Sequence, residues 1–282
     1  MNEMIAPIIE PIELINLIKS QPIILIDARG EANASELYNL EHLAGALRVD
    51  LNLDLADIKA DAAMGGRHPL PSPERFCQLL EQLGISPESH VVVYDQKNGS
   101  NAAARFWWMM KSIGHNKIQF LNGGLDLAKE AGFPISSNTE ETIKPATYSH
   151  SKWSLPVVMM EEVELLRKNP DYLIIDVRDA FRYDGISEPI DLIAGHIPGA
   201  TNIPYSGNLD EKGNFLPKDV LANKYLPLLN GRDMDHVLVH CGSGVTACHT
   251  ILALSHAEIG IPKLYVGSWS EWSRNNMEMV TA

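Results

Sequence analysis

Apolar residues along this chain follow two alternating patterns. Short continuous apolar runs, such as Pro22–Ile26 and Tyr172–Ile175, each lead into an acidic residue. Runs of this length and composition predict strands that are buried on both faces. Segments 12–18 and 160–167, which precede these runs, place apolar residues at helical spacing. Strands that alternate with helices predict an α/β fold, with a mainly parallel sheet flanked by helices on both faces.

The pattern occurs twice in the sequence. The block Ile26–Arg29 reads Ile-Asp-Ala-Arg, and Ile175–Arg178 reads Ile-Asp-Val-Arg, 149 residues later. Further matched blocks follow in the same order: Glu41–Ala46 with Gly195–Ala200, His90–Asp95 with His236–Cys241, and Phe120–Gly124 with Tyr265–Ser268. Such repetition predicts an internal duplication. We expect domains at residues 1–138 and 155–282, joined by a polar linker at residues 139–154.

Composition and charge narrow the range of partners. Of the 282 residues, 45% are hydrophobic and 21% are charged, and the formal net charge is −13. An acidic surface repels nucleic acid and anionic membranes, so we expect neither as a partner. A local basic pocket for a small anion remains compatible with this net charge.

Cysteine usage and the N-terminal residues indicate a compartment. The cysteines Cys77, Cys241 and Cys248 lack the spacing of a disulfide framework, a metal site or a Cys-x-x-Cys pair. Residues 1–20 lack the basic and apolar stretches of a secretory signal. No apolar run reaches the ~18 residues of a membrane span. The sequence therefore predicts a cytoplasmic protein.

Cys241 has the surroundings of a reactive anion site. It follows the predicted strand 237–239 and precedes a helix that we expect to begin near Ala247. Backbone N–H groups at a helix N-terminus favour a thiolate and, equally, a persulfide anion. Glycines in the intervening loop let successive N–H groups converge on the sulfur. The loop positions that we expect to bind substrate are Gly242, Gly244, Val245 and Thr246.

Two other interpretations of this loop have to be weighed. A lone cysteine in a tight turn is often only a small buried residue. A cysteine phosphatase has the same loop geometry, and His240-Cys241 fits the start of its His-Cys-x5-Arg motif. That enzyme class needs the arginine to clamp phosphate, and Ala247 stands at the arginine position. The glycines and the helix start favour a functional cysteine, and Ala247 disfavours a phosphatase.

The loop Cys241–Ala247 resembles the active-site signature of the 3-mercaptopyruvate sulfurtransferases, within the tandem rhodanese family. Asp176–Arg178, Gly195–Ala200 and Gly267–Trp272 are similar to further family blocks, and the resemblance spans both repeats. It implies two rhodanese-like domains. It also implies a sulfurtransferase that moves sulfur from 3-mercaptopyruvate, through a persulfide on Cys241, to a thiol or cyanide, with release of pyruvate. No metal or organic cofactor is implied.

The resemblance also implies roles for individual side chains. Asp95 stands at the cysteine position of the first repeat, so that domain is non-catalytic. Ser243 matches the family's catalytic serine, and His68, in a His-x-Leu-Pro block, matches the histidine that relays protons with it. Asp57 lies at the matching distance for the aspartate that completes this triad, with Asp54 as the alternative. Without the resemblance, Ser243 would be interpreted as a helix cap and His68 as an exposed loop residue.

The resemblance also implies that an arginine binds the carboxylate of the substrate. Arg182 aligns with the family residue in this role, and its planar fork of donors suits a carboxylate; the alternative is a solvated surface arginine. The family usually adds a second arginine after a Glu-Pro pair. Here none follows Glu188-Pro189, and Asp191 stands nearby. Thiosulfate therefore remains the alternative donor, although the neutral residues 242–244 lack the cations that thiosulfate-using relatives carry there.

A non-catalytic rhodanese-like binding or sensor module is a third interpretation. Degenerate members of the family lose the cysteine, whereas this chain keeps Cys241 with its glycines. The expected partners are a small-molecule sulfur donor and a thiol or thioredoxin-like acceptor.

Overall fold

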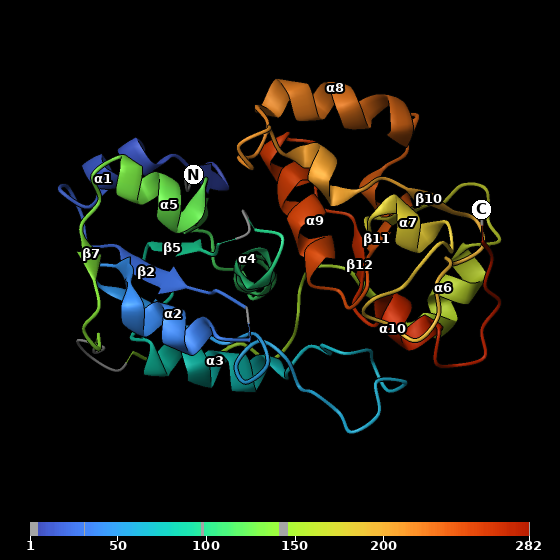
Figure 1. Cartoon of the computed structure of the whole chain (residues 1–282), viewed down its shortest axis with the longest axis horizontal. Coiled ribbons are helices and arrows are strands. Elements are labelled where there is room, and N and C mark those ends of the chain that lie inside the picture. Colours follow the sequence, from blue (N-terminus) through green and yellow to red (C-terminus); the bar gives the residue numbers. More distant parts are fainter. Residues whose placement is uncertain (1–4, 31, 97–98, 141–145, 282) are drawn as a thin grey trace. The chain divides into compact units, whose positions relative to one another are not determined.

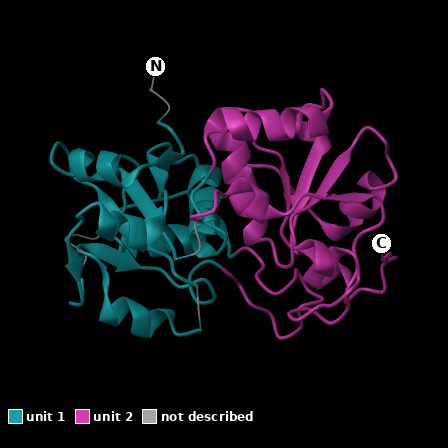
Figure 2. Ribbon diagram, turned by 45° about the horizontal axis from the view of Figure 1, so that its top comes forward, with its two compact units in different colours: residues 1–55, 71–154, 213–215 teal, residues 56–70, 155–212, 216–282 magenta. Residues whose placement is uncertain are grey.

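The computed structural model describes residues 5–30, 32–96, 99–140 and 146–281, which divide into two compact units (Figure 2). Unit 1 comprises residues 1–55, 71–154 and 213–215, and unit 2 comprises residues 56–70, 155–212 and 216–282. Each unit therefore contains a short segment from the other half of the chain. Of the predicted linker, residues 141–145 lie outside the described residues, and residues 146–154 cluster with unit 1.

Unit 1 is built on a sheet that, among the described residues, has five strands in the order β1-β6-β5-β2-β4, all paired in parallel. These strands are β1 (Ile8–Ile9), β2 (Ile24–Asp27), β4 (Ala46–Arg48), β5 (Val91–Tyr94) and β6 (Ile118–Leu121). A separate antiparallel pair joins β3 (His42–Leu43) and β7 (Ile135–Ser136). The helices are α1 (Pro11–Leu17), α2 (Ala34–Leu40), α3 (Pro73–Gln82), α4 (Ala102–Ser112) and α5 (Gly124–Glu130). Figure 1 shows α1 and α5 on one side of the sheet and α3 on the other.

Unit 2 repeats this arrangement in the described part of the chain. Its five parallel strands have the order β8-β12-β11-β9-β10, which is the order of unit 1 position for position. They are β8 (Val157–Val158), β9 (Leu173–Asp176), β10 (Ala200–Asn202), β11 (Val237–His240) and β12 (Lys263–Tyr265). The helices are α6 (Met160–Leu166), α7 (Ala180–Tyr183), α8 (Lys218–Leu229), α9 (Thr246–His256) and α10 (Ser268–Trp272), with short 3-10 turns η1 (Tyr205–Asn208) and η2 (Met234–His236). Figure 1 shows α8 and α9 on one side of this sheet and α6 and α10 on the other.

The α/β class, the parallel sheets and the duplication are thus confirmed. The predicted strands at residues 22–26 and 172–175 occupy Ile24–Asp27 and Leu173–Asp176, shifted toward the acidic residue that ends each run. The shift arises because the carboxylate belongs to the strand: Asp27 pairs with Tyr94, and Asp176 with His240, in the parallel registers.

Local sequence signals explain where helices begin. Helix α1 starts with Pro11 at its first turn, and Glu10 and Glu13 form a reciprocal capping box. Helix α3 also starts with a proline, and the Ser72 hydroxyl accepts the Arg75 N–H at 3.2 Å. Apolar side chains of these helices then pack on the sheet, as Leu14 does in the core of unit 1.

The repeated Asp-x-Arg block forms a buried ion pair at the end of each central strand. Arg29 Nη2 lies 2.7 Å from Asp27 Oδ2, and Arg178 Nη2 lies 2.6 Å from Asp176 Oδ2. Each guanidinium also donates to a backbone carbonyl of the next repeated block, Arg29 to Glu41 O at 2.8 Å and Arg178 to Gly195 O at 2.7 Å. Asp176 and Arg178 are therefore structural partners, as are Asp27 and Arg29.

The repeated His-x-x-Gly-Ala block also has a structural role. In unit 1 the His42 ring stacks on Tyr38 with centroids 3.9 Å apart, and the Tyr38 hydroxyl donates to Ala46 O at 2.7 Å. In unit 2 His196 stacks on Tyr183 at 3.6 Å, and the Tyr183 hydroxyl donates to Ala200 O at 2.5 Å. Both histidines are therefore used in packing rather than in chemistry.

Replacing Asp27 with Asn tests the buried ion pair. The change removes the buried carboxylate that pairs with the Arg29 guanidinium, so we expect the free energy of unfolding to fall by about 3 kcal/mol. The measurement is urea unfolding of Asp27→Asn beside Glu88→Gln. Glu88 pairs with Lys117 on the exposed surface at 3.5 Å, and we expect no measurable change for its variant. Equal losses in the two variants would contradict the assigned role.

Candidate active site

Cys241 follows β11 directly, and α9 begins five residues later at Thr246, one residue before the predicted start. Its side chain is buried, with 2% of the residue exposed. The carbonyl of Cys241 accepts the Trp269 N–H at 3.0 Å, and that of Gly242 accepts the Ser270 N–H at 2.9 Å. The loop is therefore fixed between β11, α9 and α10, with the N-terminus of α9 at its end.

Ser268, at the start of α10, holds the backbone of Cys241. Its hydroxyl accepts the Cys241 N–H at 3.1 Å and donates to Tyr265 O at 2.8 Å. Ser268 has a left-handed backbone, with φ of 53°, which is unfavourable for a residue other than glycine. Gly124 adopts nearly the same φ, 56°, at the matching position of unit 1. The two hydrogen bonds offset the strain at Ser268, and they explain a serine at this place.

The glycines of the loop are required for different reasons. Gly244 has φ of 74°, and a Cβ there would lie 2.4 Å from Val266 O, so no side chain fits. A Cβ on Gly242 would instead approach two guanidinium groups, 3.0 Å from Arg67 Nη2 and 3.3 Å from Arg182 Nη2. Gly242 therefore lies directly beside positive charge.

The matching loop of unit 1 contains an anion of its own. Asp95 Oδ1 accepts the Gly99 N–H at 2.9 Å, and Oδ2 accepts the Ala103 N–H at 3.2 Å, with the residue 1% exposed. A carboxylate thus occupies the place that Cys241 has in unit 2, and it is bound by N–H groups of the loop and the start of α4. This arrangement supports the prediction that the loop of Cys241 stabilises a negative charge.

His68 and Ser243 are brought together although 175 residues separate them. His68 Nδ1 lies 2.8 Å from Ser243 Oγ. The segment that contains His68 is attached to α10: Gly65 N donates to Glu271 Oε1 at 2.9 Å, and Arg67 N donates to Ser270 Oγ at 3.0 Å. Ser243 therefore contacts the histidine with which the resemblance pairs it.

The two candidate aspartates lie in different settings. Asp57 belongs to unit 2, where its N–H donates to the carbonyl of Pro69, the residue after His68, at 2.9 Å. Its carboxylate lies 2.5 Å from Lys59 Nζ. Asp54 belongs to unit 1 and accepts the Asp50 N–H at 2.7 Å, and burial raises the pKa of Asp54. Asp57 is therefore the better candidate for a partner of His68.

Arg182, on α7, is not a solvated surface residue. It is 7% exposed, its Nε donates to Glu188 Oε1 at 2.9 Å, and its Nη2 lies 3.3 Å from Asp191 Oδ2. Burial would raise the pKa of Glu188, but hydrogen bonds from Arg182 and from backbone N–H groups hold it below its usual range. Arg182 is thus a charged, oriented donor beside the loop.

Sequence reasoning missed two further arginines near this loop. Arg67 Nε lies 3.1 Å from Asp191 Oδ1, and Arg274 Nη1 lies 3.1 Å from the same oxygen. Arg67 immediately precedes His68 and could have been noticed for that reason. Arg274 has no comparable signal, because only the fold brings it to Asp191.

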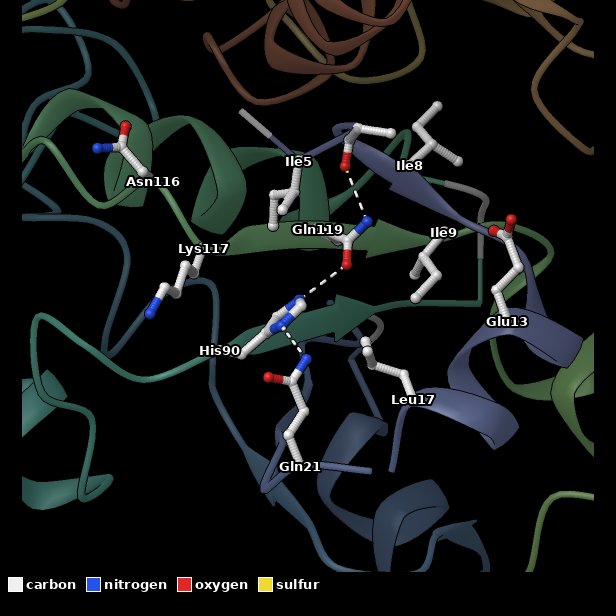
Figure 3. A pocket seen from close by; sticks show the side chains of 11 residues that line it. Ile5, Ile8, Ile9, Glu13, Leu17, Gln21, His90, Asn116, Lys117 and Gln119 are labelled. Atoms are coloured by element: carbon white, nitrogen blue, oxygen red, sulfur yellow. Dashed lines mark hydrogen bonds between the residues drawn. The ribbon is translucent and has the colours of Figure 1, made fainter. Parts of the chain in front are cut away.

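The described residues contain other features that we assign no catalytic role. A cavity of about 510 Å³ lies beside β1 and β6 of unit 1, where His90 bonds to Gln119 at 2.8 Å and to Gln21 at 3.2 Å (Figure 3). Its described lining contains no cysteine, serine or arginine. No cluster of metal-ligating side chains occurs in the described part of the chain. Nor does any described helix have the length and apolar character to cross a membrane.

Comparison with known proteins gives consistent matches. A family model described as the rhodanese-like domain matches residues 10–131 and again residues 159–275. The Pseudomonas aeruginosa protein named "Probable 3-mercaptopyruvate sulfurtransferase" is 37% identical over 239 residues, which cover 84% of this chain and 83% of that protein. The Arabidopsis thaliana "Thiosulfate/3-mercaptopyruvate sulfurtransferase 2" is 33% identical over 270 residues, covering 87% and 76%. The solved structure of 3-mercaptopyruvate sulfurtransferase from Leishmania major is similar with a TM-score of 0.82 at 29% identity, covering 95% of this chain and 74% of that one.

Replacing Gly244 with Ala tests how tightly the loop is built. Gly231 has the same φ of 74°, and its Cβ would meet nothing within 4 Å, so Gly231→Ala is the matched control. We expect Gly231→Ala to lower the free energy of unfolding by about 1–2 kcal/mol through backbone strain alone. Gly244→Ala adds the clash with Val266 O, so it should lose about 1–3 kcal/mol more. Urea unfolding measures both, and equal losses would mean that the loop can move away from Val266.

Proposed function

The chain belongs to the family of rhodanese-like domains, and from this premise we propose that it is a sulfurtransferase acting on 3-mercaptopyruvate. In this proposal, sulfur passes through a persulfide on Cys241 to a thiol or cyanide, and pyruvate is released. The observation that carries the proposal is the 2.8 Å hydrogen bond between His68 and Ser243 in the loop of the cysteine. The pair offers a proton source close to the proposed nucleophile. A leaving group that departs as a carbanion or enolate needs such a proton.

The first half of the reaction breaks a carbon–sulfur bond. The Cys241 thiolate attacks the sulfur of 3-mercaptopyruvate, a sulfur–sulfur bond forms, and the electron pair of the carbon–sulfur bond becomes a pyruvate enolate. His68 supplies the proton that converts the enolate to pyruvate, directly or through the Ser243 hydroxyl. Asp57 is proposed to orient His68. The loop N–H groups, from Gly242 to Thr246, stabilise the negative charge at sulfur.

The second half of the reaction discharges the persulfide. A thiolate or cyanide attacks the outer sulfur, the sulfur–sulfur bond breaks, and Cys241 leaves with the electron pair as a thiolate. With cyanide the product is thiocyanate. The enzyme returns to its starting state, so no metal or organic cofactor is consumed or required in the scheme.

Substrate orientation is assigned to the arginines beside Gly242. The hydrogen bonds of Arg182 and of Arg67 use Nε and Nη2, and Nη1 of each has no protein partner among the described residues. We assign the carboxylate of the substrate to these two nitrogens, because guanidinium N–H groups bind a carboxylate strongly. Arg67 thereby supplies the second arginine that is missing after Glu188-Pro189.

Thiosulfate is the second candidate donor, because the Arabidopsis thaliana relative is named for both donors. The neutral residues 242–244 argue against a dianion in the loop itself. A phosphatase is not supported, because the side chain of Ala247 is buried and offers no guanidinium. A non-catalytic module does not account for the retained Cys241, Ser243 and His68.

The acceptor and the compartment are part of the same proposal. A thiol, including that of a thioredoxin-like protein, is the expected acceptor, because a persulfide exchanges readily with thiolates. None of the three cysteines, which all lie in the described part of the chain, forms a disulfide. This supports a reducing compartment such as the cytoplasm.

Replacing Cys241 with Ala tests the sulfur carrier. We expect thiocyanate formation from 3-mercaptopyruvate and cyanide to fall to the uncatalysed rate, because no side chain remains to hold the sulfur. The control is Cys77→Ala, which removes a buried thiol on α3 of unit 1 and should retain activity. Thiocyanate production that survives in Cys241→Ala would overturn the proposal, and faster turnover of thiosulfate by the wild type would reverse the assignment of the donor.

Replacing His68 with Asn tests the proton source. We expect kcat for 3-mercaptopyruvate to fall about 10²-fold or more, because the enolate loses its general acid. The discharge of a persulfide that is preloaded on Cys241 with polysulfide should continue at the wild-type rate, since that step needs no carbon protonation. Stopped-flow measurement of both half-reactions separates the two effects. An equal loss in both would show that His68 maintains only the loop structure.

A further inference from the structure

Asp191 is a buried carboxylate on which arginines from separate segments converge. Among the described residues it forms ion pairs with Arg67 at 3.1 Å, Arg182 at 3.3 Å and Arg274 at 3.1 Å. Its own side chain has no solvent exposure, whereas those of the arginines retain 26%, 9% and 16%. The carboxylate therefore lies beneath the guanidinium groups, where it holds like charges together that would otherwise repel one another.

The ion pairs extend from Asp191 to further charged residues, and together they determine the net charge of the site. Arg182 also pairs with Glu188, and Glu188 reaches Arg178, which pairs with Asp176. Four guanidinium groups and three carboxylates are thus connected in the described part of the chain, which leaves a formal net charge of one positive unit. We call these residues the arginine cluster: Arg67, Arg178, Arg182, Arg274, Asp176, Glu188 and Asp191. His240 lies 3.7 Å from Asp176, but burial lowers the pKa of His240, so its ring is counted as neutral.

The cluster meets the catalytic loop at Gly242. A Cβ on Gly242 would lie 3.0 Å from Arg67 Nη2, 3.3 Å from Arg182 Nη2 and 3.5 Å from Asp191 Oδ2. An anion that reaches the two guanidinium groups from Cys241 therefore also comes close to the Asp191 carboxylate. Its binding depends on the net charge of the whole cluster and not on the arginines alone.

We propose that Asp191 determines the choice of sulfur donor, by lowering the charge of the arginine cluster to a value that suits a monoanion. This inference rests on the proposed sulfurtransferase function. 3-Mercaptopyruvate carries one negative charge at its carboxylate, and one net positive unit balances it. Thiosulfate carries two, so it leaves one negative charge uncompensated beside Asp191. Asp191 thus disfavours the dianion more than the monoanion.

The test is a series of variants that changes the charge of the cluster by known steps. Asp191→Asn raises the net charge to two positive units, Arg274→Gln lowers it to zero, and the double variant returns it to one. For each variant, kcat/KM is measured with 3-mercaptopyruvate and with thiosulfate, using cyanide as acceptor, and the ratio of the two values is compared. Arg232→Gln is the matched control, because it removes a positive charge where Arg232, among the residues that the structure describes, bonds to backbone carbonyls and to no carboxylate.

We expect Asp191→Asn to shift the ratio of the two kcat/KM values toward thiosulfate by roughly 10- to 100-fold. One unit of charge within a few ångströms of the bound anion is sufficient for a change of this size. Arg274→Gln should shift it in the opposite direction, the double variant should regain the wild-type ratio, and Arg232→Gln should keep it. Asp191→Glu preserves the charge and should also keep it. A ratio that stays constant across the folded variants, or that follows the residue replaced rather than the charge, would overturn the proposal.

Failure of this inference is distinct from failure of the proposed function. If the wild type transfers sulfur from neither donor, the function itself is wrong. If it transfers sulfur and the ratio does not respond to charge, only the role of Asp191 is wrong. Should Asp191→Asn fail to fold, Arg274→Gln still decides the matter, because it alters the charge at a partly exposed side chain and has a predicted direction.

Discussion

The loop between the end of a central buried strand and the start of the next helix is the constraint on which both units depend, because it fixes one side chain in a buried position. Unit 1 satisfies it with Asp95, whose carboxylate accepts N–H groups from the loop and the following helix. Unit 2 has Cys241 at the same place, with Ser268 bonded to its backbone. The duplicated fold therefore provides the same loop position twice, and the proposed sulfur transfer depends on which side chain occupies it.

The groups that we propose to act with Cys241 reach its loop through a segment that lies far away in the sequence. Residues 56–70 are bound to α10 by hydrogen bonds to Ser270 and Glu271, which places His68 on Ser243. The same segment delivers Arg67 to Asp191. In the proposed mechanism, one stretch of backbone thus links proton supply to anion recognition. The closing block at residues 267–272 contains the residues that bind this segment.

The sequence predicted those features of the fold that depend on residues close together in the chain. Alternating apolar runs predicted the sheets, and the repeated blocks predicted that both units share one topology. The glycines around Cys241 correctly indicated a tight loop. The cluster at Asp191 could not be predicted. Arg67 lies 124 residues from Asp191 in the sequence, and no local pattern indicates a contact between residues so far apart. Asp191 was noticed only as the place where an arginine was missing, whereas the fold brings arginines from other segments to it.

The most direct test of the central claim is to find the transferred sulfur on Cys241. The protein is mixed with 3-mercaptopyruvate in the absence of an acceptor, pyruvate is quantified, and the cysteine-containing peptides are analysed by mass spectrometry. The account predicts a burst of one pyruvate per active site and a gain of one sulfur atom on the peptide with Cys241, which cyanide then removes. Pyruvate formed without added sulfur on this peptide, or sulfur found on Cys77 or Cys248 instead, would contradict it.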